Sequence, residues 1–409
     1  MSQLKGNMVI AQGGGPTAVI NQSLVGAILE ARKMPQIERI YGALHGVSGI
    51  KDEKFVDLTQ TTTAHLEAIA QTPSSALRST RDKPDDEYCQ KMFEVMQKYN
   101  IRYFFYIGGN DSSETVRIIE EKSRETGYEL RAIHIPKTID NDLMVTDHTP
   151  GFGSAARFVS QAFAGVNLDN LSIPGIYLGV VMGRSSGFLA ASSILAHRYN
   201  DDAPHLVYLP ERRFDVDRFL DDVQKRYDEM GRCVISLSEG IWSEKDEKGH
   251  HKPMIATLYE RKGEDVPRDP FGHPQLSGGV LADTLVALLR DKIGVKRIRG
   301  DTFGYLQRSF LGCVSSVDQQ EARDVGEKAI QFAMSGSGSV CIRRIGHYAV
   351  NYFLETDLSK IAAKTKVIPD AWINKEGNGM TEDFRRYATP LIGQPLLPEL
   401  LQAPPVLTK

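Results

Sequence analysis

Short apolar runs alternate with longer amphipathic stretches along this chain, and the alternation restricts the folds that it can adopt. Runs at residues 8–11, 103–107 and 130–135, among others, have the length of buried strands, and most are followed by helical periodicity. Such alternation predicts mainly parallel sheets with helices on both faces. We therefore expect an α/β fold, with more than one domain because 409 residues are too many for one ordinary core. It should contain two Rossmann-like three-layer α/β/α domains with the active site in the cleft between them.

The sequence shows no exact domain boundary, but the run before Gly151 has the pattern of the end of a first unit. The first domain is expected to comprise residues 1–148 together with roughly 305–340, and the second residues 149–304 together with roughly 341–409. Residues 243–253 show no apolar period and are expected to form an exposed excursion. The tail beyond Thr389 is rich in proline and leucine, and we expect it to pack without regular helix.

Charge and cysteine usage exclude several classes of function. The net charge is −3 with both signs mixed along the chain, so there is no electrostatic basis for binding nucleic acid or an anionic membrane. The four cysteines lie far apart, which argues against a disulfide framework and fits a reducing cytosol. The N-terminus has the pattern of neither a signal peptide nor a membrane span. We expect a cytoplasmic protein that binds anionic ligands through local arginines and lysines.

Glycine-rich turns follow two of the predicted strands. The turn Gly13-Gly14-Gly15 would let backbone N–H groups approach an anion at a helix N-terminus. The run at residues 108–112, Gly-Gly-Asn-Asp-Ser, adds Asn110, a hard oxygen ligand suited to Mg²⁺. Tight turns without a ligand, or helix capping in the second run, are the structural alternatives. Neither turn carries the dinucleotide fingerprint, which argues against a nicotinamide dehydrogenase.

The segment at residues 136–142, Pro-Lys-Thr-Ile-Asp-Asn-Asp, follows an apolar strand and is difficult to explain by structure alone. A turn tied by Asp and Asn caps is the structural alternative, but two carboxylates and a lysine in so short a loop are costly. We predict that Asp140 acts as a general base toward a sugar hydroxyl. Lys137 would neutralise charge that develops on the transferring phosphoryl group. Four arginines in short polar or glycine-bearing segments could hold phosphate in a two-pronged manner, or could be ordinary surface charges: Arg81, Arg184, Arg299 and Arg308.

At these motifs the sequence resembles the phosphofructokinase family, and the match runs across most of the chain. The family patterns Pro-x-Thr-Ile-Asp-Asn-Asp, Met-Gly-Arg, Ser-Glu-Gly and Gly-x-x-Gln-Arg stand in family order at residues 136–142, 182–184, 238–240 and 304–308. The resemblance implies phosphoryl transfer to the 1-hydroxyl of fructose 6-phosphate in glycolysis or gluconeogenesis, in a homodimer or homotetramer. It also implies the sugar-phosphate residues Thr138, Ile139, Asp140, Met182, Gly183, Arg184, Glu239, Tyr305 and Arg308, with Arg299 reaching across a subunit interface.

Two positions predict the phosphoryl donor. ATP-using members of the family resemble Gly-Gly-Asp-Gly and Pro-Gly-Thr-Ile-Asp, whereas this chain has Asp111 and Lys137 in place of the two discriminating glycines, as in the diphosphate-dependent branch. Asp111 fills the space of the α-phosphate and nucleoside, and a carboxylate beside a phosphate costs about 1–4 kcal/mol. We therefore predict diphosphate as the donor, held by Gly14 and Arg81. An ATP-dependent phosphofructokinase and a non-catalytic sugar-phosphate sensor are the alternatives.

The sequence departs from the family pattern at three places. Asn110 stands where the family has its Mg²⁺-binding Asp, so we expect Mg²⁺ as the cofactor but with weaker binding at this uncharged ligand. The first glycine turn lacks the usual Ala-Pro-Gly ending. Gly175 stands where ATP-using relatives have a substrate arginine, which makes sedoheptulose 7-phosphate a candidate second acceptor.

Overall fold

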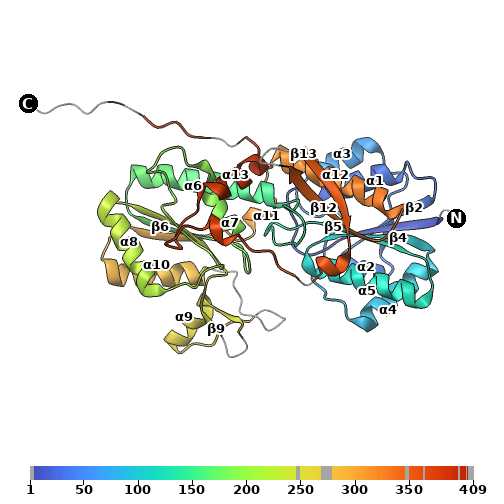
Figure 1. Ribbon diagram of the computed structural model, residues 1–409, viewed down its shortest axis with the longest axis horizontal. Helices are drawn as coiled ribbons and strands as arrows, with labels where there is room; N and C mark the ends of the chain where they lie inside the picture. Colours follow the sequence, from blue (N-terminus) through green and yellow to red (C-terminus); the bar gives the residue numbers. More distant parts are fainter. Residues whose placement is uncertain are drawn as a thin grey trace, which may run out of the picture.

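The computed structural model describes residues 4–245, 249–268, 279–345, 350–362, 364–394, 397–401 and 403. They form two lobes, each built on one sheet (Figure 1). The lobe at the right of Figure 1 holds a seven-stranded sheet made of β1 (Gly6–Gln12), β2 (Ile37–Ala43), β3 (Phe55–Asp57), β4 (Ile101–Gly108), β5 (Arg131–Pro136), β12 (Gly338–Ile345) and β13 (Val350–Thr356). The spatial order is β13-β12-β5-β4-β1-β2-β3. The five inner strands are parallel, and the two edge strands run antiparallel to their neighbours.

Both faces of this sheet are buried, because its central strands are apolar at every position rather than at alternate ones. Met8 and Ile10 of β1 point into the hydrophobic cluster on one face, and Val9 and Ala11 point into the cluster on the other. In Figure 1, α1, α3 and α12 lie above the sheet, and α2, α4 and α5 lie below it. Their bounds are α1 (Ile20–Ala31), α2 (Val47–Lys51), α3 (Thr63–Ala70), α4 (Asp86–Lys98), α5 (Asn110–Thr126) and α12 (Ser316–Ala333).

Helices α1 and α12 pack closely although almost 300 residues separate them along the chain. A Cβ atom at Gly26 of α1 would lie 2.5 Å from the carbonyl oxygen of Arg323, and one at Gly326 of α12 would lie 2.2 Å from that of Ser23. Only glycine at these two positions lets the backbones approach so closely. The late helix α12 is therefore an integral part of the first lobe.

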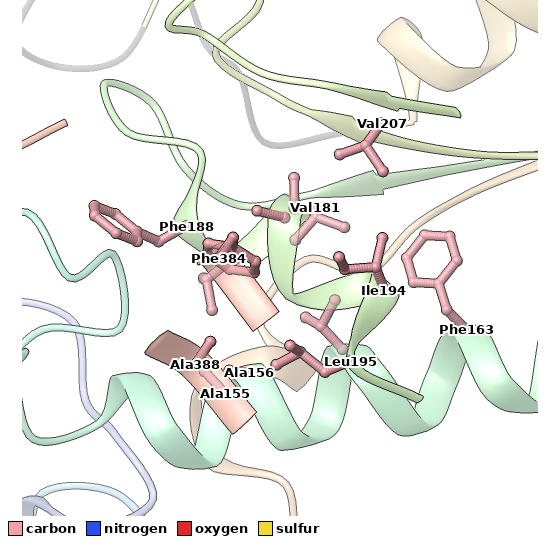
Figure 2. Close-up of a cluster of buried hydrophobic side chains, with 14 of the residues drawn as sticks. Ala155, Ala156, Phe163, Val181, Phe188, Ile194, Leu195, Val207, Phe384 and Ala388 are labelled. Carbon is pink, nitrogen blue, oxygen red and sulfur yellow. The ribbon is translucent and has the colours of Figure 1, made fainter. Parts of the chain in front are cut away.

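The lobe at the left of Figure 1 holds a four-stranded parallel sheet in the order β11-β6-β8-β7, with β6 (Ile176–Val181), β7 (Leu206–Tyr208), β8 (Cys233–Ser238) and β11 (Ile298–Thr302). One face packs against α6 and C-terminal residues, and Figure 2 draws side chains of this cluster, including Phe163, Phe384 and Ala388. The other face is covered by α8, α9 and α10. The helices are α6 (Phe152–Ser172), α7 (Phe188–Ala191), η1 (Ser192–Ala196), α8 (Val216–Met230), α9 (Met254–Lys262), α10 (Val280–Ile293), α11 (Leu306–Ser309) and α13 (Glu382–Ala388).

The chain passes between the lobes more than once. After β13 it forms η2 (Leu358–Lys360), then returns to the second lobe through η3 (Asp370–Trp372), α13 and η4 (Thr389–Ile392). The predicted α/β fold with two sheets is confirmed. The sequence predicts, however, that the second visit to the first lobe ends near residue 340, whereas β12 and β13 continue that sheet to Thr356. The reason is that β12 combines an apolar start with the polar residues Arg343 and Arg344, which hide the strand pattern.

Two peripheral segments also bear on the predictions. The expected excursion at 243–253 contains an antiparallel pair, β9 (Trp242–Lys245) with β10 (His251–Pro253), and residues 246–248 lie outside the described part. In the expected helix-free tail, η4 forms one short 3₁₀ turn with Leu391 and Ile392 buried. Among the described residues, none of the helices combines the length and the apolar character needed to cross a membrane.

Candidate active site

A cleft of about 390 Å³ opens where the two lobes meet. Parallel strands end at the same edge of a sheet, so the loops after β1, β4 and β5 converge there from one side, and those after β6 and β8 from the other. The residues that line it are Gly14, Gly15, Thr80, Arg81, Asp82, Lys83, Tyr106, Gly109, Asn110, Asp111, Ser112, Thr115, Lys137, Thr138, Asp140, Asp142, Met182, Arg184, Ser185, Glu239, Tyr305 and Arg308.

The loop after β5 is shaped by its own side chains. The hydroxyl of Thr138 accepts a hydrogen bond from the Asp140 N–H at 3.1 Å, and the Thr149 hydroxyl donates to the Thr138 carbonyl at 2.8 Å. Asn141 has φ 59°, a left-handed conformation that asparagine tolerates better than most residues. These features reverse the chain between Asp140 and Asp142, and both residues line the cleft.

Lys137 bridges two of the predicted motifs. Its side chain is buried, with 3% of the residue exposed, and its Nζ donates to the carbonyl oxygen of Gly15 at 2.7 Å. Burial and the nearby Arg308 guanidinium together lower the pKa of Lys137 to about 7, against the opposing effect of Asp140. A cation that has lost its hydration in this way interacts strongly with an incoming anion.

Three of the carboxyl groups that line the cleft have raised pKa values. Burial raises the pKa of Asp140 above its ordinary range. Burial and the neighbouring Asp140 raise the pKa of Asp142 to about 7, and the same two causes raise the pKa of Glu239 to about 7. A carboxyl group with a raised pKa can take up a proton near neutral pH and return it, as a general acid–base group must.

Asn110 and Asp111 occupy the first two positions of α5, at the positive end of the helix dipole. The Nδ2 of Asn110 donates to an Asp142 carboxylate oxygen at 3.2 Å, whereas its Oδ1 is buried and has no hydrogen-bond partner. A buried oxygen without a donor, next to a carboxylate, fits a hard cation such as Mg²⁺. Among the described residues there is no cluster of three His, Cys, Asp or Glu that could hold a metal.

The opposite wall comes from the second lobe. Gly240 lets the turn after β8 pack on the loop after β6, because a Cβ atom there would lie 2.1 Å from the Arg184 carbonyl oxygen. This contact brings Glu239 beside Met182 and Arg184. The Arg308 guanidinium lies over the Tyr305 ring, 4.7 Å from its centroid, while 61% of Tyr305 is exposed. The wall thus offers two guanidinium groups to a phosphate.

Not every predicted site residue lines the cleft. The Ile139 side chain is in the hydrophobic core, so this residue could reach a ligand only through its backbone. Gly183 lies immediately behind the wall, where its carbonyl accepts from Ser238 at 2.6 Å. Arg299 is exposed on the edge strand β11, away from the cleft, and Gly175 lies at the opposite end of β6. The ligand roles of these residues and of those that do line the cleft stay predictions.

Sequence reasoning missed the segment at residues 79–83 apart from Arg81. Its backbone lies on the first glycine turn, where the Gly14 N–H donates to the Thr80 carbonyl at 3.0 Å and the Ser79 hydroxyl donates to the Gly14 carbonyl at 2.6 Å. Lys83 forms an ion pair with Asp111 at 3.5 Å. The three consecutive charged residues Arg81, Asp82 and Lys83 indicate a candidate binding segment in the sequence. No predicted strand directs this segment to the cleft, however.

Comparisons with known proteins extend over almost the whole chain. The family model described as Phosphofructokinase matches residues 7–333. The chain is 60% identical over 393 residues to the Pyrophosphate--fructose 6-phosphate 1-phosphotransferase of Rhodospirillum rubrum, covering 95% of each protein. It is 36% identical over 399 residues to a protein of the same name from Xanthomonas campestris pv. campestris, covering 95% of this chain and 91% of the relative. The crystal structure of a pyrophosphate-dependent phosphofructokinase from Marinobacter aquaeolei is similar with a TM-score of 0.83 and 30% identity, covering 97% of this chain and 93% of that one.

Proposed function

Because this chain belongs to the phosphofructokinase family, we propose that it reversibly transfers a phosphoryl group from diphosphate to the 1-hydroxyl of D-fructose 6-phosphate. The products are D-fructose 1,6-bisphosphate and phosphate, and the reaction serves glycolysis or gluconeogenesis. The observation that carries the proposal is the pair Asp111 and Lys137, which both line the cleft. The names of the relatives, with up to 60% identity, support the same donor and acceptor.

Asp140 is the general base in this proposal. It accepts the proton of the sugar 1-hydroxyl as that oxygen forms a bond to phosphorus, and the bond from phosphorus to the bridging oxygen of diphosphate breaks. Phosphate is the leaving group. The raised pKa of Asp140 supports both directions, since the protonated acid can return its proton to the sugar oxygen in the reverse reaction.

Lys137 and the arginines neutralise the transferring and leaving groups. Lys137 faces the first glycine turn, where Gly14 and Arg81 are proposed to hold diphosphate. The Gly14 N–H is already bonded to Thr80, so diphosphate would meet other groups of this turn first. Arg184 and Arg308, which both line the cleft, would hold the 6-phosphate of the acceptor.

Asn110 and Asp142 would hold Mg²⁺ through Oδ1 and a carboxylate oxygen. When bound, the ion supplies positive charge that offsets the phosphate oxygens. Asn110 contributes no charge of its own. The protein residues therefore give a weaker site than two carboxylates would, and more of the binding depends on diphosphate.

Asp111 excludes nucleotides by its position at the start of α5. It is exposed and paired with Lys83 at 3.5 Å, and both residues line the cleft. An α-phosphate would have to displace Lys83 and approach a carboxylate. Diphosphate has no α-phosphate or nucleoside and would need less of this space.

We also propose a homodimer or homotetramer. Arg299 is exposed on an edge strand, and exposed apolar side chains next to the cleft support contact with a second copy: Tyr305, Leu306, Phe310 and Leu311. Gly175, at the far end of β6, could then influence acceptor choice only in a neighbouring copy, including any use of sedoheptulose 7-phosphate. Four free, buried cysteines support a reducing, cytoplasmic location.

A coupled assay with each donor tests the proposed function. Fructose 1,6-bisphosphate should form with diphosphate and Mg²⁺, and not with ATP. Turnover with ATP alone would identify an ATP-dependent kinase instead. Binding of fructose 6-phosphate without turnover with either donor would identify a sensor.

A further inference from the structure

A C-terminal segment lies directly against the loop that carries Asp140. Thr365 pairs with Leu143 in an isolated antiparallel bridge, and the Lys366 N–H donates to the carbonyl oxygen of Asp142 at 2.7 Å. These contacts join residues more than 220 positions apart in sequence. Lys366 also lies beyond the residues 7–333 that the family model matches.

The side chain of Lys366 ends among oxygen atoms on the side of the loop away from the cleft. Its Nζ donates to the Asp147 carbonyl at 2.8 Å, to the Thr146 carbonyl at 3.2 Å and to Asn141 Oδ1 at 3.3 Å. It also lies over the Phe188 ring, 5.3 Å from its centroid. An ammonium group has three protons to donate, and here all three have an acceptor.

Asn141 receives a second support on its other atom. Its Nδ2 donates to the Tyr387 hydroxyl at 2.7 Å, and that hydroxyl donates to the Asp147 carbonyl at 2.8 Å. Asn141 is fully buried and left-handed, and it stands between the two carboxylates of the loop. The conformation of this one residue therefore determines how Asp140 and Asp142 are presented to the cleft.

We propose that Lys366 is a positioning residue for the phosphoryl transfer: it holds the loop reversal at Asn141 and thereby the direction of Asp140 and Asp142. The inference rests on the proposed phosphotransferase activity. Lys366 does not line the cleft, so it acts through Asn141 and the main chain of Asp142 rather than on substrate. Small displacements of a catalytic group lower turnover strongly, by up to about a hundredfold for 1 Å.

The test compares Lys366→Met with Lys364→Met in the full chain. Methionine keeps the unbranched stem beside Phe188 but removes the charge and the three donors. Lys364 is an exposed lysine two residues away whose Nζ donates to the Ser359 carbonyl. We expect Lys366→Met to lower kcat about tenfold to a hundredfold, with the KM for fructose 6-phosphate changed less than about threefold. Lys364→Met should behave as wild type, and Lys366→Arg should recover part of kcat.

Two results would overturn the proposal. One is a kcat for Lys366→Met within about twofold of wild type. The other is a lower kcat together with a higher KM and a lower melting temperature, with no recovery in Lys366→Arg. That result would show a merely structural role. Absence of diphosphate turnover in the wild type would instead refute the proposed function, so the two failures are distinguishable.

A second variant keeps the test decisive if Lys366→Met does not fold. Asn141→Gly removes the side-chain link while glycine accepts the positive φ without strain. It should lower kcat to a similar degree, and the double variant should be no slower than the slower single variant, because both remove the same link. Normal turnover in Asn141→Gly, or fully multiplicative losses in the double variant, would overturn the inference.

Discussion

Asn110 donates from its side-chain nitrogen to Asp142 at 3.2 Å, so the start of α5 is bonded to the loop after β5. An aspartate at position 110 would face Asp142 as a second carboxylate. The neutral amide avoids this repulsion, and it leaves one buried oxygen without a donor. This relationship connects metal binding to the stability of the metal-free protein.

Asn110→Asp should therefore lower the Mg²⁺ concentration for half-maximal activity, by about tenfold, or about 1.4 kcal/mol. In a chelator the same variant should melt at a lower temperature than wild type, because two carboxylates then face each other without a cation. Asn110→Ala is the matched control and should raise the Mg²⁺ requirement. An unchanged Mg²⁺ titration in Asn110→Asp would remove residue 110 from the metal site.

Asp140→Asn should lower kcat by on the order of 10²–10⁴, since it removes the proton acceptor while keeping the shape of the side chain. The affinity for fructose 6-phosphate should change little, because Arg184 and Arg308 remain. Steady-state kinetics and titration calorimetry measure the two quantities separately. Near-normal turnover in this variant would exclude Asp140 as the base.

Substitution of Asp111 should change which phosphoryl donor the enzyme accepts. Asp111→Gly removes bulk and charge from the end of the cleft, and we expect weak but measurable turnover with ATP. The double variant Asp111→Gly with Lys137→Gly should have less activity with diphosphate than Asp111→Gly alone, because it loses the cation that bonds to Gly15. If ATP turnover stays undetectable in both variants, donor choice depends on residues elsewhere.

The pH profile of kcat/KM for diphosphate should be bell-shaped. The base must be ionised, so the rate falls as the pH decreases through the raised pKa of Asp140. Lys137 must be charged, and burial lowers its pKa to about 7, so the rate also falls as the pH rises above about 7. Lys137→Arg should move the alkaline limb to higher pH, because arginine keeps its charge there. A wild-type profile that stays flat from pH 7 to 9 would contradict this role for Lys137.

Sequence patterns identified the elements that are apolar throughout. The run at residues 103–107 lies within β4, because both faces of that strand are buried. Strand β2 was missed, because Glu38 and Arg39 are exposed near the sheet edge and break the apolar run. Helix α5 begins at Asn110, so Asn110 and Asp111 of the second glycine-rich run belong to the helix and do not only precede it.

The residues of the candidate site also fall into those that the sequence predicts and those that it does not. The loop from Lys137 to Asp142 was predictable, because its chemistry is contiguous in sequence and follows an obvious strand. Lys83, Lys366 and Tyr387 were not predictable. Each contacts a residue of the site only because segments that are distant in sequence pack together. Neither the ion pair of Lys83 with Asp111 nor the support of Asn141 has a local sequence pattern.

The late position of α12 and β12 has a consequence for synthesis on the ribosome. The apolar face of α1 and the open edge of β5 are covered only after α12 and β12 have been made, when all four strands of the second lobe's sheet have already been synthesised. An unpaired strand edge with an uncovered apolar face invites association with other chains. The nascent protein thus carries an aggregation-prone surface through most of translation. We expect chaperone dependence to arise in this N-terminal lobe, rather than in the lobe that is synthesised after it.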